Sequence, residues 1–255
     1  MIYPNLDDQA AGLIGGGAVD AGQVAIILGT SAVVNSSASA STKSGTLDVM
    51  KLNRDRYLWM RCYNNGAQFL DTIVGKKPNW EKLEREASEV PPGCDGVSLL
   101  PFVFPEPSRG IAKPRLEWFP AEPAHEGVRF RASLEALAYL VAVAVQEHID
   151  AGQNITEITV SGGIAKSNLM LSILASVLDR PLKRLQSTEG PALGAAVVAL
   201  AAHESRLREQ QAVKEPFAIA DAVKVLVQYG EPAQPVTEWT ETYRDGLRKF
   251  RDRLG

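Results

Sequence analysis

The sequence contains few residues of the types that build disulfide frameworks or metal centres. It has two cysteines, Cys62 and Cys94, and neither a CxxC pair nor a zinc-type spacing. Its three histidines are scattered, at His125, His148 and His203. This shortage argues against a disulfide-stapled fold and against a zinc centre, and we expect a chain from a reducing, cytoplasmic compartment.

Excess positive charge and long apolar runs are also missing. Lys and Arg number 27 against 30 Asp and Glu, which gives a formal net charge of -3. No long basic run is present, so we expect no nucleic-acid partner. The most apolar stretch, 134–145, is interrupted by Glu135 and is too short to span a bilayer, and no signal-peptide pattern opens the chain. We therefore expect no membrane partner.

What is present is an alternation of strand and helix patterns. Residues 24–35 are rich in β-branched side chains and are broken by Gly29-Thr30-Ser31, which predicts a hairpin with these three residues at its tip. The other predicted strands lie at 47–52, 57–62, 155–161 and 182–186, and the predicted helices at 67–74, 80–89, 131–151, 165–178, 190–203, 218–225 and 236–254. This pattern predicts an α/β fold, a mixed β-sheet with helices on both faces.

Two glycine segments could contact phosphates. The successive N–H groups of Gly29, Thr30 and Ser31 suit phosphate oxygens, although a glycine can equally serve turn geometry alone. Gly162-Gly163 follows a strand and precedes a helix, where a phosphate or a flat ring could approach the backbone, or where the glycines could form a purely structural turn. The pair does not match GxGxxG, which disfavours a Rossmann dinucleotide site.

Adjacent aspartates near the start of the chain have two interpretations. Asp7 and Asp8 precede a helical run, so they could be an N-cap and its neighbour. Alternatively, one carboxylate could act as a base in a cleft, with Gln9 beside it as a hydrogen-bonding partner for a polyol.

The order of these motifs resembles the C-terminal half of FGGY-type carbohydrate kinases. Asp-Gln-Ala-Ala at 8–11 is followed by a glycine-rich stretch, the strand-GTS-strand hairpin, SGG with a Ser-Asn pair behind it, and EGPALGAA. The segment VSGGIAKSNLMLSILASVLDRPLKRLQSTEGPALGAAVVAL, residues 160–200, is similar to the adenosine-binding signature of that family. The resemblance covers nearly the whole chain and implies one lobe of an actin-like, ribonuclease-H-like ATPase fold.

The resemblance also implies roles for particular residues. Asp8, seven residues before Gly15, matches the aspartate that acts as base toward the sugar hydroxyl, and Gln9 matches a position that contacts substrate hydroxyls. The positions that match ATP contacts are Gly29, Thr30, Ser31, Asn65, Gly66, Gly162, Gly163, Ser167 and Asn168. The implied cofactors are ATP and Mg²⁺, with no metal ligand from the chain itself.

The implied organisation is a nucleotide-binding lobe at 1–206, with a loop-rich insert at about 78–123, and a helical tail at 207–255 packed on it. The sequence holds no DxGT-like first phosphate turn, which the family carries in an N-terminal lobe. Two hypotheses follow. The chain supplies the ATP-binding lobe and the catalytic aspartate of a sugar or polyol kinase, or it is a non-catalytic nucleotide-binding or interaction module derived from one. The expected small-molecule partners are the sugar and ATP. The expected protein partner is the N-terminal lobe or a second chain, and a homodimer is one form of the latter.

Overall fold

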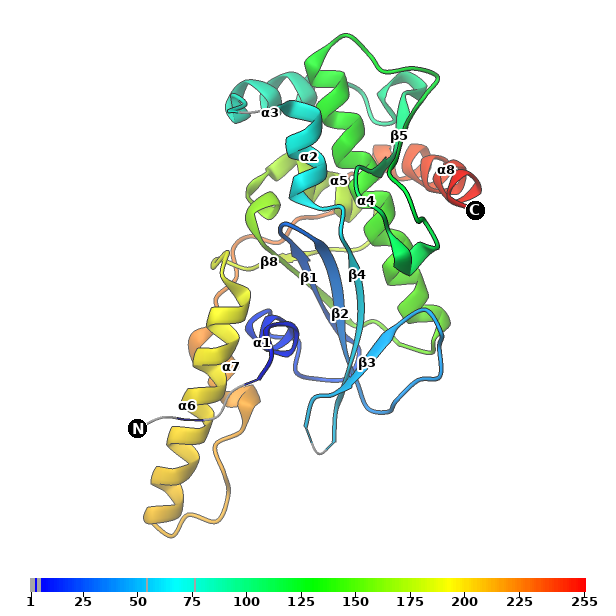
Figure 1. Ribbon diagram of the computed structural model, residues 1–255. Helices are drawn as coiled ribbons and strands as arrows, with labels where there is room; N and C mark the ends of the chain where they lie inside the picture. Colours follow the sequence, from blue (N-terminus) through cyan, green and yellow to red (C-terminus); the bar gives the residue numbers. More distant parts are fainter. Residues whose placement is uncertain (1–2, 4–5, 54, 76) are drawn as a thin grey trace.

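The computed structural model describes residues 3, 6–53, 55–75 and 77–255. A six-stranded mixed sheet forms its centre, in the order β3-β4-β2-β1-β7-β8 (Figure 1). The strands are β1 (Gln23–Leu28), β2 (Ala32–Ala38), β3 (Asp48–Lys51), β4 (Tyr57–Tyr63), β7 (Glu157–Ser161) and β8 (Lys183–Arg184). β1, β2, β4 and β3 pair antiparallel, whereas β7 runs parallel to β1 and β8 parallel to β7. The predicted hairpin is confirmed, with Leu28 opposite Ala32.

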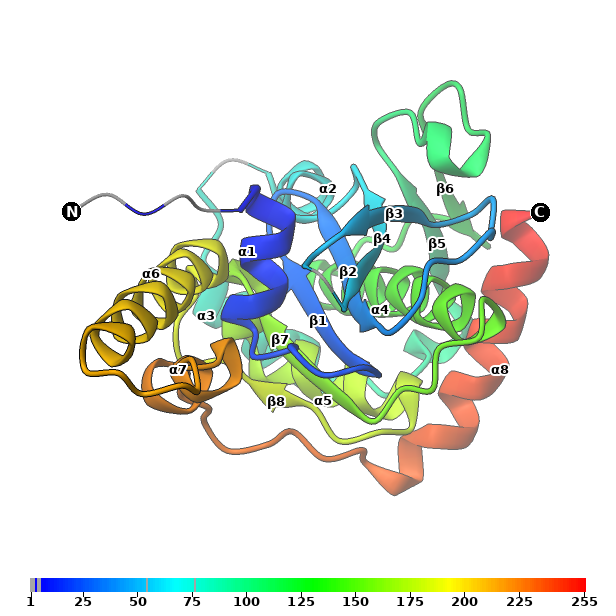
Figure 2. The same cartoon turned by 90° about the horizontal axis from the view of Figure 1, so that it is seen from below.

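Helices cover both faces of the sheet, as predicted. α4 (Glu126–Asp150) and α5 (Asn168–Leu178) lie on one face, and α1 (Asp8–Gly15), α6 (Gly190–Gln210) and α7 (Ile219–Leu226) on the other (Figure 2). Side chains along β1 alternate between the two: Val24 and Ile26 join the core under α4, while Ala25 joins the core under α1. Both faces of the strand are therefore packed against helices, which explains why it is apolar from Val24 to Leu28.

α8 (Thr237–Leu254) closes the α4 side of the molecule. It packs against α4 and α5, and it buries Tyr243 and Phe250. α4 begins at Glu126, five residues before the predicted start, and it buries two charged residues, Arg131 and Glu135. These two form an ion pair at 3.1 Å, which offsets the free-energy cost of burying the two charges. Within the described residues, no helix is both long enough and apolar enough to cross a membrane.

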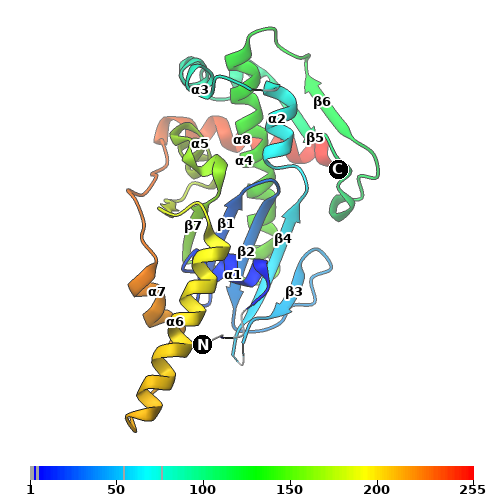
Figure 3. The same cartoon turned by 60° about the vertical axis from the view of Figure 1, so that its left-hand side comes forward.

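The segment expected to be a loop-rich insert has more regular structure than predicted. α3 (Trp80–Glu89) matches its predicted range, and α2 (Ala67–Val74) precedes it as expected. After α3, however, β5 (Ser98–Phe102) and β6 (Arg115–Phe119) form an antiparallel ribbon beside α4 and α8 (Figure 3). Pro101 lies within β5 opposite Leu116. A two-stranded ribbon consists of edge strands, which tolerate proline, so the prolines here did not exclude a strand.

Other boundaries also differ from the predictions. The strand predicted at 182–186 is reduced to Lys183–Arg184, because Leu182 and Leu185 form bridges to Ala233 and Tyr229 of the tail. A 3₁₀ turn, Gly163–Lys166, precedes α5, so the α-helix starts three residues after the predicted Ala165. α6 continues to Gln210, so the expected division at 206 and 207 falls within a helix. The division into lobe and tail stays a prediction.

Candidate active site

The two aspartates at the start of α1 have different environments. Asp7 is the N-cap: its carboxylate accepts hydrogen bonds from the backbone N–H groups of Gln9 and Ala10, both at 3.0 Å. Asp8 is the first residue of the helix and is exposed. Among the described residues, its carboxylate is reached by one donor, Gln9 Nε2, at 3.4 Å. Asp7 is therefore committed to the helix, and Asp8 is available to a ligand.

Gln9 connects this helix to the centre of the sheet. Asn35 Nδ2, on β2, donates to both the side-chain Oε1 and the backbone O of Gln9, each at 3.3 Å. Asn35 is fully buried, and its Oδ1 has no partner among the described residues. Sequence reasoning missed Asn35. The available signal was the polar run Asn35-Ser36-Ser37, which continues an apolar strand pattern and is entirely buried.

Close backbone contact with α6 fixes the position of α1. A Cβ on Gly15 would lie 1.9 Å from the carbonyl O of Gly190, and a Cβ on Gly194 would lie 1.8 Å from that of Ala11. Only glycine permits backbones to approach this closely. The small-residue segment at 190–196 thus packs against α1, and the placement of Asp8 depends on it.

The hairpin tip is held from one side and open on another. Gly29 N donates to Ser31 O at 3.0 Å, and Ala67 N donates to Gly29 O at 2.8 Å, so the start of α2 fastens the turn. A Cβ on Gly66 would lie 2.6 Å from Gly29 O, whereas a Cβ on Gly29 would meet nothing nearer than Ser31 O at 3.9 Å. An open hollow of about 480 Å³ adjoins the tip, lined in part by Thr30, Ser31, Asn64, Gln68 and Phe104.

Asn65 is used to hold the insert. It is fully buried, its Oδ1 accepts from Phe104 N at 2.9 Å, and its Nδ2 donates to Phe104 O at 3.3 Å and to Glu106 Oε2 at 3.1 Å. Both ends of its amide are therefore occupied within the chain. The structure brings Gly66 against the hairpin tip, whereas the side-chain amide of Asn65 is engaged by the insert.

The second glycine segment lies at the same edge of the sheet as the hairpin tip. β1 and β7 are parallel, with Ile27 opposite Ser161, so Gly29 and Gly162 follow the ends of neighbouring strands. Gly162 has a φ of +97°, and a Cβ there would lie 2.3 Å from Leu28 O. A Cβ on Gly163 would meet nothing within 4 Å. Gly162 therefore serves the turn, and Gly163 presents open backbone.

Ser167 and Asn168 also divide into a structural and an accessible residue. Ser167 caps α5 by accepting from Met170 N at 2.9 Å, and it donates to the Glu84 carboxylate at 2.8 Å. Asn168 is exposed, and its Oδ1 accepts from a terminal nitrogen of Arg184 at 2.6 Å. Arg184 lines a hollow of about 230 Å³ together with Gly162, Lys166, Gln186, Ser187 and Thr188. No sequence pattern marked Arg184, because it belongs to a two-residue strand.

The charge of Asp8 is one of several that act on Cys62, which lies on β4 opposite Val33, two residues after the hairpin tip. Burial raises the pKa of the Cys62 thiol, a hydrogen bond with Ser31 opposes the shift, and the charges of Glu106, Asp48 and Asp8, in that order, add to it. Among the described residues, no group of three His, Cys, Asp or Glu side chains is arranged to hold a metal ion.

The arrangement matches a known family. The profile of the C-terminal domain of the FGGY family of carbohydrate kinases matches residues 24–203, most of the chain. The chain belongs to the FGGY family of carbohydrate kinases. The match contains the hairpin, the Gly162-Gly163 turn and the first part of α6, so these features belong to the family's C-terminal domain.

Relatives and solved structures agree with this assignment. The chain is 26% identical to the xylulose kinase of Staphylococcus epidermidis over 206 residues, which is 78% of this chain and 42% of that protein. The structure of xylulose kinase from Rhodospirillum rubrum superposes with a TM-score of 0.82 at 24% identity, covering 96% of this chain and 49% of that one. Gluconate kinase from Lactobacillus acidophilus gives 0.80 at 17% identity, with the same coverage.

These structures confirm the predicted fold, a lobe of the actin-like ATPase type. The chain spans less than half the length of each of these three proteins. Kinases of this family use ATP.

Proposed function

We propose that this chain is the ATP-binding lobe of a carbohydrate kinase and supplies the catalytic base, Asp8, for phosphorylation of a sugar or polyol hydroxyl. The observation that carries the proposal is the difference between the two aspartates at the start of α1. Asp7 caps the helix, while Asp8 is exposed beside Gln9. A carboxylate with one weak partner among the described residues can accept a proton from a bound hydroxyl.

The proposed mechanism relies on positioning. Phosphoryl transfer passes through a loose transition state, so the protein mainly orients the reactants and stabilises charge. Asp8 orients the acceptor hydroxyl and takes its proton as the new P–O bond forms. Gln9, fixed by Asn35, hydrogen bonds a neighbouring hydroxyl of the substrate. The glycine contacts between α1 and α6 keep both side chains in place.

ATP fits the open glycine positions. The backbone at Gly29 and Gly163 has room for a ligand, because a Cβ there would meet no atom closer than 3.9 Å. Gly29, Thr30 and Ser31 would hold phosphate oxygens, and Gly163 and Asn168 would contact the adenosine. Mg²⁺ would be held chiefly by the phosphates and water, as is usual for this ion, and it would neutralise charge on the phosphates. Gly66, Gly162 and Ser167 would act by shaping the site, and a role for Asn65 would be of this indirect kind.

The substrate and the rest of the site are part of the proposal. The matched xylulose and gluconate kinases are each about twice as long as this chain, which supports a site shared with an N-terminal lobe or a second polypeptide. Their names point to a ketopentose or an aldonate as substrate. Alternatively, a second copy of this chain would supply the part of the site that an N-terminal lobe supplies.

Calorimetric titration with ATP, followed by an assay of sugar-dependent ADP release, tests the proposal. We expect the chain to bind ATP and to release ADP only when an N-terminal lobe of an FGGY kinase is supplied. ATP binding without turnover in the presence of that lobe would favour the non-catalytic module. Absence of ATP binding with the lobe present would contradict both.

A further inference from the structure

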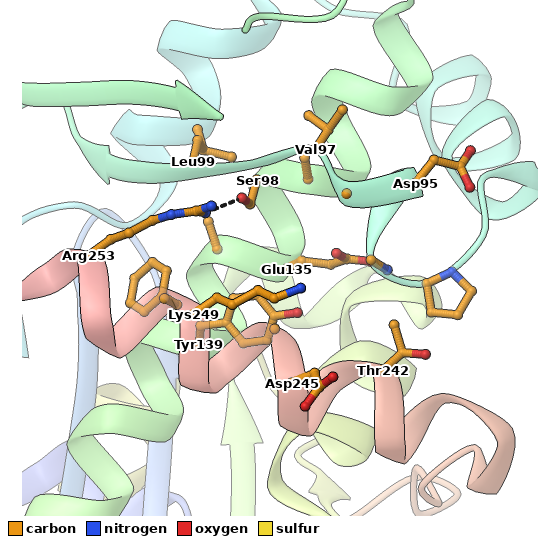
Figure 4. Close-up of a pocket in the computed structure, with 17 residues that line it drawn as sticks. Asp95, Val97, Ser98, Leu99, Glu135, Tyr139, Thr242, Asp245, Lys249 and Arg253 are labelled. Atoms are coloured by element: carbon orange, nitrogen blue, oxygen red, sulfur yellow. Dashed lines mark hydrogen bonds between the residues drawn. The ribbon is translucent and has the colours of Figure 1, made fainter. Parts of the chain in front are cut away.

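A cavity of about 370 Å³ lies between α4, α8 and the start of β5, and none of the predicted kinase residues lines it. We call it the α4–α8 cavity. In Figure 4, Glu135 and Tyr139 enter it from α4, and Lys249 and Arg253 from α8, with Val97 and Ser98 on the opposite side. Its volume is within the range of small-molecule sites, at the lower end.

The floor of the α4–α8 cavity holds two buried polar groups with unused hydrogen-bonding capacity. Tyr139 is 3% exposed, and its hydroxyl makes no hydrogen bond within the described part of the chain. The hydroxyl lies against Gly246 of α8, where a Cβ would be only 2.1 Å away. The hydroxyl is not one of the fully buried unpartnered atoms, and Tyr139 lines the cavity, so a ligand or water there can hydrogen bond with it.

Glu135 is the second floor group. Its Oε1 accepts from Gly93 N, Arg131 Nε and Tyr243 Oη at 3.0 to 3.1 Å, so three donors fix the carboxylate. None of these bonds reaches Oε2, which can accept from a hydroxyl in the cavity. Arg131 compensates the buried charge, so the floor as a whole favours a neutral donor, such as an alcohol, over a second cation.

The mouth of the α4–α8 cavity carries two cations, Lys249 and Arg253, and two carboxylates, Asp95 and Asp245. The Lys249 ammonium has no hydrogen bond or ion pair within the described residues, and its side chain is exposed. Arg253 is held by Ser98 Oγ at 2.5 Å and lies over the Phe119 ring at 4.1 Å. Of these two carboxylates, Asp245 is already paired with Arg248 at 3.0 Å, and Asp95 lies on the η1 turn (Cys94–Gly96), away from α8. An anionic group at the mouth would therefore find Lys249 free.

We propose that the α4–α8 cavity binds a small hydroxylated anion, a molecule with hydroxyl groups at one end and a carboxylate or phosphate at the other. Its hydroxyl groups pair with Tyr139 and Glu135 Oε2, and its anionic group pairs with Lys249 and Arg253. This site is separate from the proposed kinase site, so it can bind whether or not the chain has kinase activity.

Titration of isotope-labelled chain, followed by NMR, tests the proposal. The probes are gluconate and glycerol 3-phosphate, with glycerol and inorganic phosphate as half-ligands. We expect at least one hydroxylated anion to shift the amide signals of Gly93 and Gly246 at millimolar concentration. These shifts should not depend on shifts at Gly29 or Gly163, which belong to the proposed kinase site. The probe that binds then identifies the anionic group as carboxylate or phosphate.

Two variants locate the contacts. Lys249→Gln removes an exposed cation, and Tyr139→Phe removes the buried hydroxyl while keeping the ring; each should weaken binding by about tenfold. Lys224→Gln, which removes an exposed lysine on α7, is the matched control and should bind as the wild type does. Thermal unfolding of each variant checks that it is folded.

Three outcomes would overturn the proposal. If no probe shifts the signals of Gly93 or Gly246, the cavity holds nothing but water. If inorganic phosphate reproduces the shifts of glycerol 3-phosphate, the cavity binds an adventitious ion only. The ligand lies elsewhere if both variants, shown to be folded, bind with the affinity of the wild type.

Discussion

Gly162 and Gly163 are adjacent in the chain, but their environments require glycine for different reasons. Gly162 has a left-handed φ and would place a Cβ 2.3 Å from Leu28 O. An added Cβ on Gly163 would meet no atom within 4 Å, so packing does not require glycine there. The difference could not be read from the sequence, because it depends on β1, more than 130 residues earlier in the chain.

Alanine at each position separates the two roles. Gly162→Ala should lower the free energy of unfolding by about 3 kcal/mol, because it combines backbone strain with a steric clash. Gly163→Ala should leave stability within about 0.5 kcal/mol and weaken ATP binding by about tenfold, because the methyl group covers the proposed adenosine surface. Urea unfolding and calorimetry measure these effects. Equal stability losses in the two variants would contradict the distinction.

At the scale of elements, the best sequence predictions were the local ones. The β1–β2 hairpin, α2 and α3 were located within a few residues, because each is specified by its own periodicity and turn residues. The β5–β6 ribbon was missed, since its prolines resemble loop punctuation and its pairing joins segments across a turn. Likewise, Asn65 was expected at the nucleotide cleft, and only the insert about 40 residues later explains its burial.

The contact between α1 and α6 is the element pair on which the site depends most. We predict that Gly194→Ala destabilises the fold by about 3 kcal/mol, because its Cβ would lie 1.8 Å from Ala11 O and force the helices apart. Gly230→Ala is the matched control, because no atom lies within 4 Å of its added Cβ. Urea unfolding checks both variants; a Gly194→Ala protein as stable as the control would show that the helices can separate without cost.

At the scale of the whole molecule, a buried histidine makes stability depend on pH. Burial is the main cause that lowers the pKa of His148 to about 4; the nearby charge of Arg61 contributes to this shift, and a hydrogen bond with the Val34 backbone opposes it. His148 is fully buried, and its Nδ1 lies 2.8 Å from Ser36 Oγ. The folded protein therefore keeps this side chain neutral.

The unfolded chain protonates His148 near pH 6.5, its ordinary pKa, so the unfolded state binds more protons between about pH 6.5 and about pH 4. Stability from this group is complete above that window and falls as the pH is lowered through it, by on the order of 3 kcal/mol in total. Urea unfolding across the window, for the wild type and for His148→Gln, measures the effect. We expect a smaller loss in the variant; identical losses would assign the acid sensitivity to other groups.

The proposed kinase site, like the pH dependence, draws on residues from the whole molecule, and only some of these residues were named from the sequence. Asp8, Gln9, Gly29 and Gly163 were found from motif order and are accessible in the structure. Asn35 and Arg184 were not, because each acts through a partner that is distant in the sequence. The roles of these residues stay a prediction. The exposed candidates could be named from the sequence, whereas the residues that contact them could be named only from the fold.

The central claim is that Asp8, and not Asp7, is the catalytic base. Its most direct test is the rate of sugar phosphorylation by this chain, supplied with an N-terminal kinase lobe, in the Asp8→Asn and Asp7→Asn variants. We predict that Asp8→Asn lowers kcat by roughly 100- to 10,000-fold with unchanged ATP affinity. Asp7→Asn should stay close to the wild-type rate, because asparagine caps a helix about as well as aspartate. Wild-type turnover by Asp8→Asn, or an equal loss in Asp7→Asn, would contradict the account.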